Sequence, residues 1–337
     1  MNALLNSNPF FSVMKTLTNP FMRVPGTRSG IPLNGLLVVL AFAFPCAIQA
    51  ANTEITGRIF ASPDEAIAAL RAATAAVNTN AIRDILGPAS EDLLNPDRVQ
   101  ATNELKTFGE ALAETNHLVR VSDTMVVLEL GDDLWPFPVP LMKKYGGWYF
   151  DTTVGRDELL NRRIGRNELG TLQAMRAYVD AQREYASSDH DGDEILEFAQ
   201  RLVSSPGKQD GLYWPPDDDG QLSPLGPLVA FAQEEGYELR DTDEVDRGPY
   251  HGYYFKILKG QGKHALGGKY NYVINGNMIA GFAMVAWPAD YGGSGVMTFV
   301  VNQRGRVYQK DLGSATAKIV RKMNAYDPDS TWTVSPD

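Results

Sequence analysis

Residues 278–311 read MIAGFAMVAWPADYGGSGVMTFVVNQRGRVYQKD, and this stretch decides the fold class. β-branched and aromatic residues fill its short apolar runs, and turns at Tyr291-Gly292-Gly293 and Arg304-Gly305 separate them. Such runs and turns are typical of antiparallel strands that pair in sequence order. Together with two similar runs upstream, the runs within 278–311 predict a five-stranded antiparallel meander. The expected strands are Gly252 to Leu258, Tyr270 to Ile274, Met278 to Trp287, Val296 to Val301 and Arg306 to Asp311, joined in part by Asn275-Gly276.

A long helix is expected upstream of this sheet, between Arg156 and Ala186, where leucines and other apolar residues recur at helical spacing. Gly165 or Gly170 is a candidate break in it. Residues 187–249 are rich in Asp, Gly, Pro and Ser, which predicts a loop-rich insertion with two short helices, Ile195 to Val203 and Leu225 to Glu235. Ala315 to Asn324 is expected as a final helix that covers one face of the sheet.

The N-terminal part predicts helices followed by strands. Ser62-Pro63-Asp64-Glu65 is typical of a helix start, and two helices are expected over 62–87, with a third from Glu104 to Ala113. Alternation from Leu118 to Leu130 then predicts strands, and a hairpin pairs Phe137 to Met142 with Trp148 to Thr152. The sequence therefore predicts an α+β protein with two domains. Residues 55–160 would form helices and a curved antiparallel sheet, and residues 161–337 would form a long helix packed on the meander.

Residues 1–50 have the pattern of an export signal peptide. Three basic residues and no acidic residue precede the apolar run LLVVLAFAF at 36–44, which is too short to span a bilayer. Small residues at Ala47 and Ala50 favour cleavage after Ala50, and Met1, Met14 and Met22 are all candidate starts. No later segment reaches spanning length. The sequence thus predicts an exported protein, periplasmic or extracellular, with no transmembrane segment in its mature chain.

Composition removes several classes of function. The chain has 337 residues, 31 Lys and Arg against 41 Asp and Glu, and a formal net charge of -10, so it lacks the basic surface of a nucleic-acid-binding protein. Its one cysteine, Cys46, lies in the predicted leader, and its four histidines have no metal-ligand spacing. No recognisable catalytic motif is present, and no catalytic residue is assigned. Whether the protein is an enzyme stays open, because a carboxylate pair for glycoside hydrolysis would be assembled only in space.

An acidic loop over 189–194 is a candidate calcium site. Asp189, Asp191 and Asp193 occupy alternate positions, as in the opening of an EF-hand loop, where Ca²⁺ takes oxygen ligands. Glu194 stands at the sixth position, where glycine is usual, and Gln200 at the twelfth, where a bidentate Glu is usual. The alternative is a solvated turn that caps the next helix. No other cofactor is expected.

Two aromatic groups are candidate ligand-binding residues: Tyr213 with Trp214, and Tyr250 with His251. Rings beside Pro and Gly in loops can stack on a sugar or form a docking face for a protein. The alternative is that these rings enter the hydrophobic core. The ligand would be an envelope glycan or an unknown envelope protein.

Several long motifs resemble those of an exported bacterial family, domain-of-unknown-function family 2950. They include Arg162-Arg163-Ile164-Gly165-Arg166-Asn167-Glu168, Asp210-Gly211-Leu212-Tyr213-Trp214-Pro215 and Tyr250-His251-Gly252-Tyr253-Tyr254-Phe255. The resemblance covers essentially all of the mature chain, implies export and implies no activity. Residues 168–311 are also similar in the order of their elements to the globular heads of pilin-like proteins, which pack a helix on an antiparallel sheet.

Taken together, these features predict an exported envelope or periplasmic protein that works as a non-catalytic binding or interaction module. A secreted hydrolase with a carboxylate pair and a carbohydrate or calcium binder are the alternatives. A carboxylate enzyme needs two acids about 5 to 10 Å apart, and a sugar binder needs accessible rings. An interaction module needs a broad apolar surface.

Overall fold

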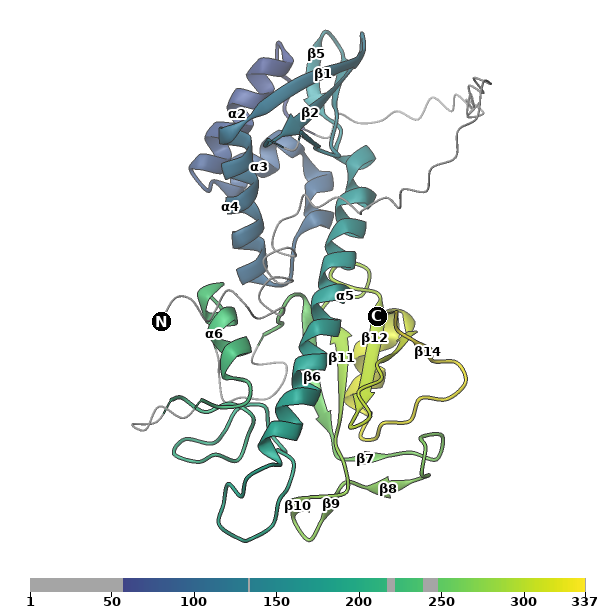
Figure 1. The fold of residues 1–337 in the computed structure, drawn as a ribbon. Coiled ribbons are helices and arrows are strands. Elements are labelled where there is room, and N and C mark those ends of the chain that lie inside the picture. Colours follow the sequence, from purple (N-terminus) through teal and green to yellow (C-terminus); the bar gives the residue numbers. More distant parts are fainter. Residues whose placement is uncertain (1–56, 133, 217–221, 239–247, 337) are drawn as a thin grey trace, which may run out of the picture.

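A computed structural model describes residues 57–132, 134–216, 222–238 and 248–336 of the chain. The predicted signal peptide, Cys46 and the acidic residues 217–219 lie outside the described residues. Helices and antiparallel sheets make up the described chain, so the α+β class is confirmed. Figure 1 shows the two groups of elements, one at each end of a long helix, α5.

The first group opens with three α-helices whose starts are fixed by side-chain caps. The oxygens of Ser62, Asn78 and Asp97 accept backbone N–H groups that have no partner within the helix. Asp97 explains why the last of these helices begins before Glu104, where the sequence predicts it. The helices are α2 (Pro63–Ala75), α3 (Thr79–Leu86) and α4 (Arg98–Glu114), with the 3₁₀ helix η2 (Pro88–Leu93) before α4.

An antiparallel sheet follows and covers these helices. Its strand order is β1-β2-β4-β5, with β3 paired to β2. The inward side chains of the sheet meet the helices in one hydrophobic core, in which Leu70, Leu112, Leu128 and Phe150 are almost completely buried. The strands are β1 (Asn116–Ser122), β2 (Met125–Leu130), β3 (Trp135–Pro136), β4 (Leu141–Lys144) and β5 (Gly147–Phe150).

Helix α5 (Thr152–Tyr185) runs without a break for 34 residues. It passes through both Gly165 and Gly170, so neither residue ends it. The predicted domain boundary at residue 160 therefore lies inside this helix. The division into two domains stays a prediction, but the buried apolar residues do form two separate clusters, one on each side of the middle of α5.

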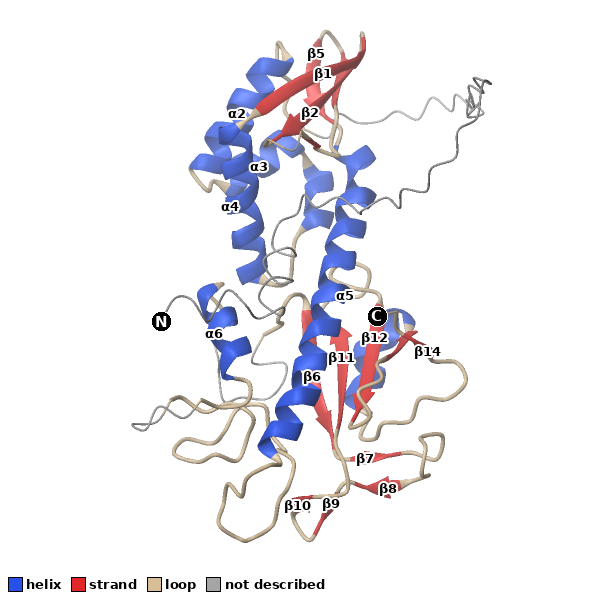
Figure 2. Ribbon diagram, in the orientation of Figure 1, coloured by secondary structure: helices blue, strands red, loops and turns tan. Residues whose placement is uncertain are grey.

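The second group is built around a five-stranded antiparallel sheet of order β14-β13-β12-β11-β6. Helix α5 packs on it, and the Tyr178 hydroxyl donates to the Ala283 carbonyl at 3.2 Å. Figure 2 shows α5 lying along these strands. The strands of the sheet are β6 (Tyr253–Leu258), β11 (Ala283–Pro288), β12 (Met297–Asn302), β13 (Tyr308–Asp311) and β14 (Thr333–Val334); α6 (Gly226–Glu234), η3 (Gly313–Ala315) and α7 (Thr316–Arg321) complete the group.

The membership of this sheet differs from the sequence prediction. Residues 270–274 are not one of its strands, and β14 is the fifth. The predicted strand from Met278 to Trp287 is interrupted because Gly281 has φ +142°, a conformation open to glycine alone. The residues between β6 and β11 instead form two small ladders, β7 (Gly260–Gln261) with β8 (Tyr270–Asn271) and β9 (Val273–Ile274) with β10 (Asn277–Met278).

The helix expected from Ile195 to Val203 does not form. The side chain of Gln182 accepts from the Ala199 amide at 2.9 Å and donates to the Ala199 carbonyl at 2.8 Å. Because both backbone groups of Ala199 are occupied in this way, they cannot join an α-helical ladder. The segment instead passes beside the end of α5 without forming a helix. Among the described residues, no helix is long and apolar enough to cross a membrane.

Candidate functional site

The first predicted aromatic pair lies in the core rather than on the surface. Trp214 is 4% exposed and packs in the second hydrophobic cluster, where its ring lies beside Tyr185 and His190. Tyr213 is half-buried against the same cluster. The Trp214 ring therefore offers no exposed stacking surface, which corrects the expectation of an accessible ring at this position.

The second pair lies in a tight turn. Tyr250 and Tyr253 exchange two backbone hydrogen bonds, of 2.9 and 3.1 Å, around the two-residue loop His251-Gly252. Both loop residues have positive φ, +47° for His251 and +74° for Gly252. This is the geometry of a type I′ turn, in which Asn-Gly is the preferred pair. Non-glycine residues are uncommon in the left-handed region, and histidine is one of the few types that enter it more often than the rest, so His251 adopts an unusual backbone conformation.

The turn aims the imidazole of His251 at a carboxylate. Its Nε2 lies 2.9 Å from Oε2 of Glu235, the residue that follows α6. The rings of Tyr237 and Tyr250 contact the imidazole, with centroids 5.7 and 4.3 Å away. We call Glu235, Tyr237, Tyr250 and His251 the His251 cluster.

Burial affects both tyrosines of this cluster. It raises the pKa of Tyr250 far above its ordinary value, and the charges of Glu235 and Asp97 add to the effect. Burial is also the main cause that raises the pKa of Tyr237, and the charge of Asp97 is the second cause. The buried Tyr250 hydroxyl has no hydrogen-bond partner among the described residues. It is thus a neutral hydroxyl whose hydrogen-bonding capacity is unused.

Asp97 connects the His251 cluster to the N-terminal group. One carboxylate oxygen accepts from the Gln100 amide at 3.0 Å and caps α4. The other accepts from the Tyr237 hydroxyl at 2.8 Å and from the Gly252 amide at 3.1 Å. At 1% exposure, Asp97 is buried with its charge distributed over three donors, so one side chain serves as a helix cap and as a link between the two groups of elements.

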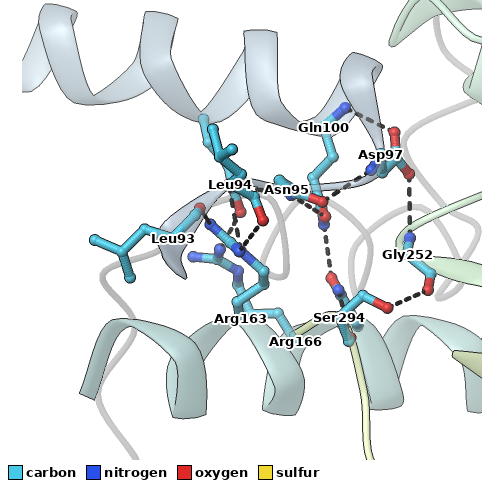
Figure 3. Close-up of polar contacts among 11 residues, drawn as sticks. Leu93, Leu94, Asn95, Asp97, Gln100, Arg163, Arg166, Gly252 and Ser294 are labelled. Atoms are coloured by element: carbon cyan, nitrogen blue, oxygen red, sulfur yellow. Dashed lines mark hydrogen bonds and ion pairs between the residues drawn. The ribbon is translucent and has the colours of Figure 1, made fainter. Parts of the chain in front are cut away.

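Asn167 of α5 makes a second link, between Gln100 and Ser294, two residues that Figure 3 labels beside Asp97 and Gly252. Its side-chain oxygen accepts from Gln100 Nε2 at 2.7 Å, and its Nδ2 donates to the Ser294 carbonyl at 2.8 Å. The Ser294 hydroxyl in turn donates to the Gly252 carbonyl at 2.8 Å. Asp97, Gln100, Asn167, Gly252 and Ser294 form what we call the Asp97 network.

Two arginines of α5 bind the N-terminal group next to this network. Arg163 donates to the carbonyls of Leu93 and Leu94 at 2.6 and 3.3 Å, and Arg166 is paired with Glu104. Burial lowers the pKa of the Arg163 guanidinium, while the charge of Glu104 opposes that change. These contacts hold the end of η2 against the helix (Figure 3).

The predicted calcium-ligand residues come together in the acidic loop. One oxygen each from Asp189, Asp191 and Asp193 lies within 4.8 Å of the others, and all three residues are exposed. Asp189 accepts from the amides of Gly192 and Glu194, at 2.8 and 2.9 Å. These backbone donors lower the pKa of its carboxyl.

Backbone conformation and a fourth carboxylate complete the description of this loop. Glu194 has φ +64° at the position where the motif favours glycine. Glu197 follows nearby, and burial together with the charges of the three aspartates raises the pKa of its carboxyl. Asn277 donates to Asp193 at 2.7 Å, so the loop is docked on the β9 and β10 hairpin.

Sequence reasoning assigned Tyr250 and His251 but missed Glu235, Tyr237 and the Asp97 network. The structure brings Tyr250 and His251 together, whereas it leaves Tyr213 and Trp214 in a different part of the fold. No clear sequence signal marks Asn167, because α5 also buries other polar side chains, among them Arg163 and Gln182. For Asp97, the sequence shows only an acidic residue in a position typical of a helix cap, and it does not reveal the distant partners.

Comparison with known proteins gives one match. The model of the family described as a protein of unknown function, DUF2950, matches residues 57–334. No curated protein and no solved structure matches the chain.

Proposed function

Because the chain belongs to DUF2950, a family whose description names no activity, we propose a function from the chain's own residues. The protein is exported to the bacterial envelope and binds a ligand there without transforming it, through the His251 cluster. The leader pattern of residues 1–50 supports export. The packing of α5 on the five-stranded sheet supports the likeness to the globular heads of pilin-like proteins.

The observation that carries the proposal is the left-handed histidine. A non-glycine residue held in this region costs free energy, and such outliers cluster at functional sites. Asparagine at position 251 would satisfy the turn at lower cost. Histidine there places a partly exposed imidazole against the partly exposed carboxylate of Glu235 and beside the ring of Tyr250. The imidazole and the carboxylate are groups that a polar ligand can reach.

A glycan is the ligand class that fits these groups best. Sugar hydroxyls pair with carboxylate and tyrosine oxygens, and sugar faces pack on aromatic rings. The cluster supplies one carboxylate, Glu235, and three rings within 6 Å of one another, from Tyr237, Tyr250 and His251. Glycans are also a major component of the envelope to which the leader directs the chain.

The test is His251→Asn, which removes the imidazole but suits the left-handed turn. We expect the wild type to bind soluble cell-wall glycan fragments, measured by calorimetry, and the variant to bind at least tenfold more weakly at a melting temperature no lower than that of the wild type. His264→Asn is the matched control, because His264 pairs with Asp327 elsewhere on the surface. Equal affinity of wild type and His251→Asn would refute the site.

Incubation of the same fragments with the wild type separates binding from hydrolysis. Intact fragments after prolonged incubation are the expected result. Cleavage products would overturn the non-catalytic assignment and favour the hydrolase alternative, in which Glu235 and Asp97 are the carboxylates to replace first.

A second candidate function is calcium binding by the acidic loop. The specific observation is the convergence of Asp189, Asp191 and Asp193, with oxygens within 4.8 Å of one another. Ca²⁺ binds six to eight oxygens, of which these carboxylates supply three. Binding to the folded state alone would raise its stability by mass action.

Calcium titration with the melting temperature as readout tests this candidate. A rise at millimolar Ca²⁺, absent in Asp191→Asn and retained in Asp123→Asn, is the expected outcome. Asp123 is a fair control because its side chain is fully exposed at a distant hairpin. No rise at millimolar Ca²⁺ would remove the idea.

A further inference from the structure

The two groups of elements are joined by α5, and each one binds a different part of that helix. Arg163 holds the N-terminal group through the carbonyls of Leu93 and Leu94. One turn later, the Glu168 carboxylate accepts from the amides of Val296 and Met297, at 3.0 and 2.9 Å, and so holds the C-terminal group. The change of partner takes place within the six residues from 163 to 168.

Gly165 lies inside this interval and has no steric reason to be glycine. A Cβ built on it would meet nothing within 4 Å. Glycine in a helix interior weakens the helix relative to alanine because its backbone is freer in the unfolded chain. Gly165 therefore makes α5 easier to bend between the part that contacts the N-terminal group and the part that contacts the C-terminal group.

Outside α5, polar contacts join the groups, and the Val99 side chain of α4 also lies near the C-terminal group, 3.7 Å from where a Cβ of Gly236 would be. Asp97 accepts from Tyr237 and Gly252 of the C-terminal group, and Asn103 Nδ2 donates to the Glu235 carbonyl at 2.9 Å. Two units joined through polar contacts are expected to move relative to each other, whereas a large apolar interface would lock them. The hydrophobic residues form two clusters rather than one continuous core.

We propose that α5 is a hinge centred on Gly165 and that Asp97 is its latch. In the latched arrangement, the one described above, the carboxylate binds Tyr237 and Gly252. In the second arrangement those two bonds and the bond from Asn103 to the Glu235 carbonyl are broken, α5 bends between Arg163 and Glu168, and the α4 side of the His251 cluster is uncovered. The motion needs no ligand, so it stands or falls separately from glycan binding.

Distances between two spin labels measure the motion directly. The chain has one cysteine, so a Cys46→Ser background accepts labels at Arg71→Cys on α2 and Lys318→Cys on α7, both at exposed positions. We expect the wild-type distance distribution to have a major component and a minor one. Asp97→Asn keeps a helix cap when its one side-chain oxygen accepts from Gln100, but it then turns an NH₂ donor instead of an acceptor toward Gly252. It should raise the ratio of minor to major component about tenfold, the effect of losing one charge-assisted hydrogen bond.

Gly165→Ala in the Asp97→Asn background should reverse most of that rise by stiffening the helix. Asp123→Asn and Gly109→Ala are the matched controls, since Asp123 is remote and Gly109 lies within α4; neither should change the distribution. If Asp97→Asn does not fold, Tyr237→Phe removes one latch bond and leaves the cap intact. A distribution identical to that of the wild type in the folded latch variant would overturn the hinge.

Discussion

At the scale of single residues, the centre of the molecule depends on close approaches that side chains would prevent. Gly252 is the clearest case: it has φ +74°, and a Cβ there would lie 2.4 Å from Nδ2 of Asn167 and 3.0 Å from Cβ of Ser294. Asn167 is itself fully buried and bonds to both groups of elements. The absence of one methyl group thus allows the Asp97 network to form.

Gly252→Ala is therefore expected to destabilise the fold more than its backbone angle alone requires. Gly146 is a matched reference, because its φ is +80° and a Cβ there meets nothing within 4 Å. Gly146→Ala should cost about 1–2 kcal/mol, the cost of the left-handed conformation. Gly252→Ala should cost roughly 2 kcal/mol more, since an overpacked site adds about 1–3 kcal/mol. Urea unfolding of both variants measures the difference, and equal costs would show that Asn167 moves aside freely.

At the scale of elements, two glycines of α5 differ in their role. Gly155 lies in the first turns of the helix, where a Cβ would be 2.5 Å from the carbonyl oxygen of Pro138. The helix therefore approaches the loop before β4 closely enough to exclude any side chain. Gly165 faces open space, so its role is conformational rather than steric.

Replacing each glycine by alanine should give stability changes of opposite sign. Gly165→Ala is expected to raise the free energy of unfolding by up to about 1 kcal/mol, the propensity difference in an open helix position. Gly155→Ala is expected to lower it by about 1–3 kcal/mol through overpacking against backbone. Thermal and urea unfolding check both values. A loss of stability in Gly165→Ala would mean that the helix is strained at that point.

At the scale of the whole molecule, two cores share one helix. Phe150 and Phe282 are completely buried, the first among α2, α4 and the β1 to β5 sheet, the second beneath α5 on the five-stranded sheet. Truncation of either ring to alanine removes about 3–5 kcal/mol from the core that contains it. Because the buried apolar residues of the described chain form two separate clusters, the loss should remain local.

Hydrogen exchange tests the division into two domains. Phe150→Ala should speed amide exchange in β1 to β5 and leave β11 and β12 near their wild-type rates, and Phe282→Ala should do the reverse. Hydrogen exchange distinguishes the opening of one unit from the unfolding of the whole chain, because exchange becomes faster only in the part that opens. Faster exchange over the whole chain in both variants would mean a single cooperative unit.

What the sequence predicts well is local. Ser62 and the following Pro and acids locate α2, and the Gly-containing turns locate most of the hairpins, because these signals act over a few residues. What it misses depends on distant partners. Gln182 captures Ala199 and prevents a helix, and β14 joins the sheet through Tyr308. Asp97 meets a residue 155 positions away, a pairing that no local pattern encodes.

Because α5 is continuous, the number of residues in its middle segment fixes the angle and the distance between the two groups of elements. An α-helix turns by about 100° and advances by about 1.5 Å with each residue. One extra residue between Arg163 and Glu168 would rotate everything after it by that angle around the helix axis and carry Ser294 and Gly252 away from Asp97. Insertions of four residues nearly restore the angle but separate the groups by about 6 Å. The chain can therefore exchange side chains along this segment far more easily than it can gain or lose a position.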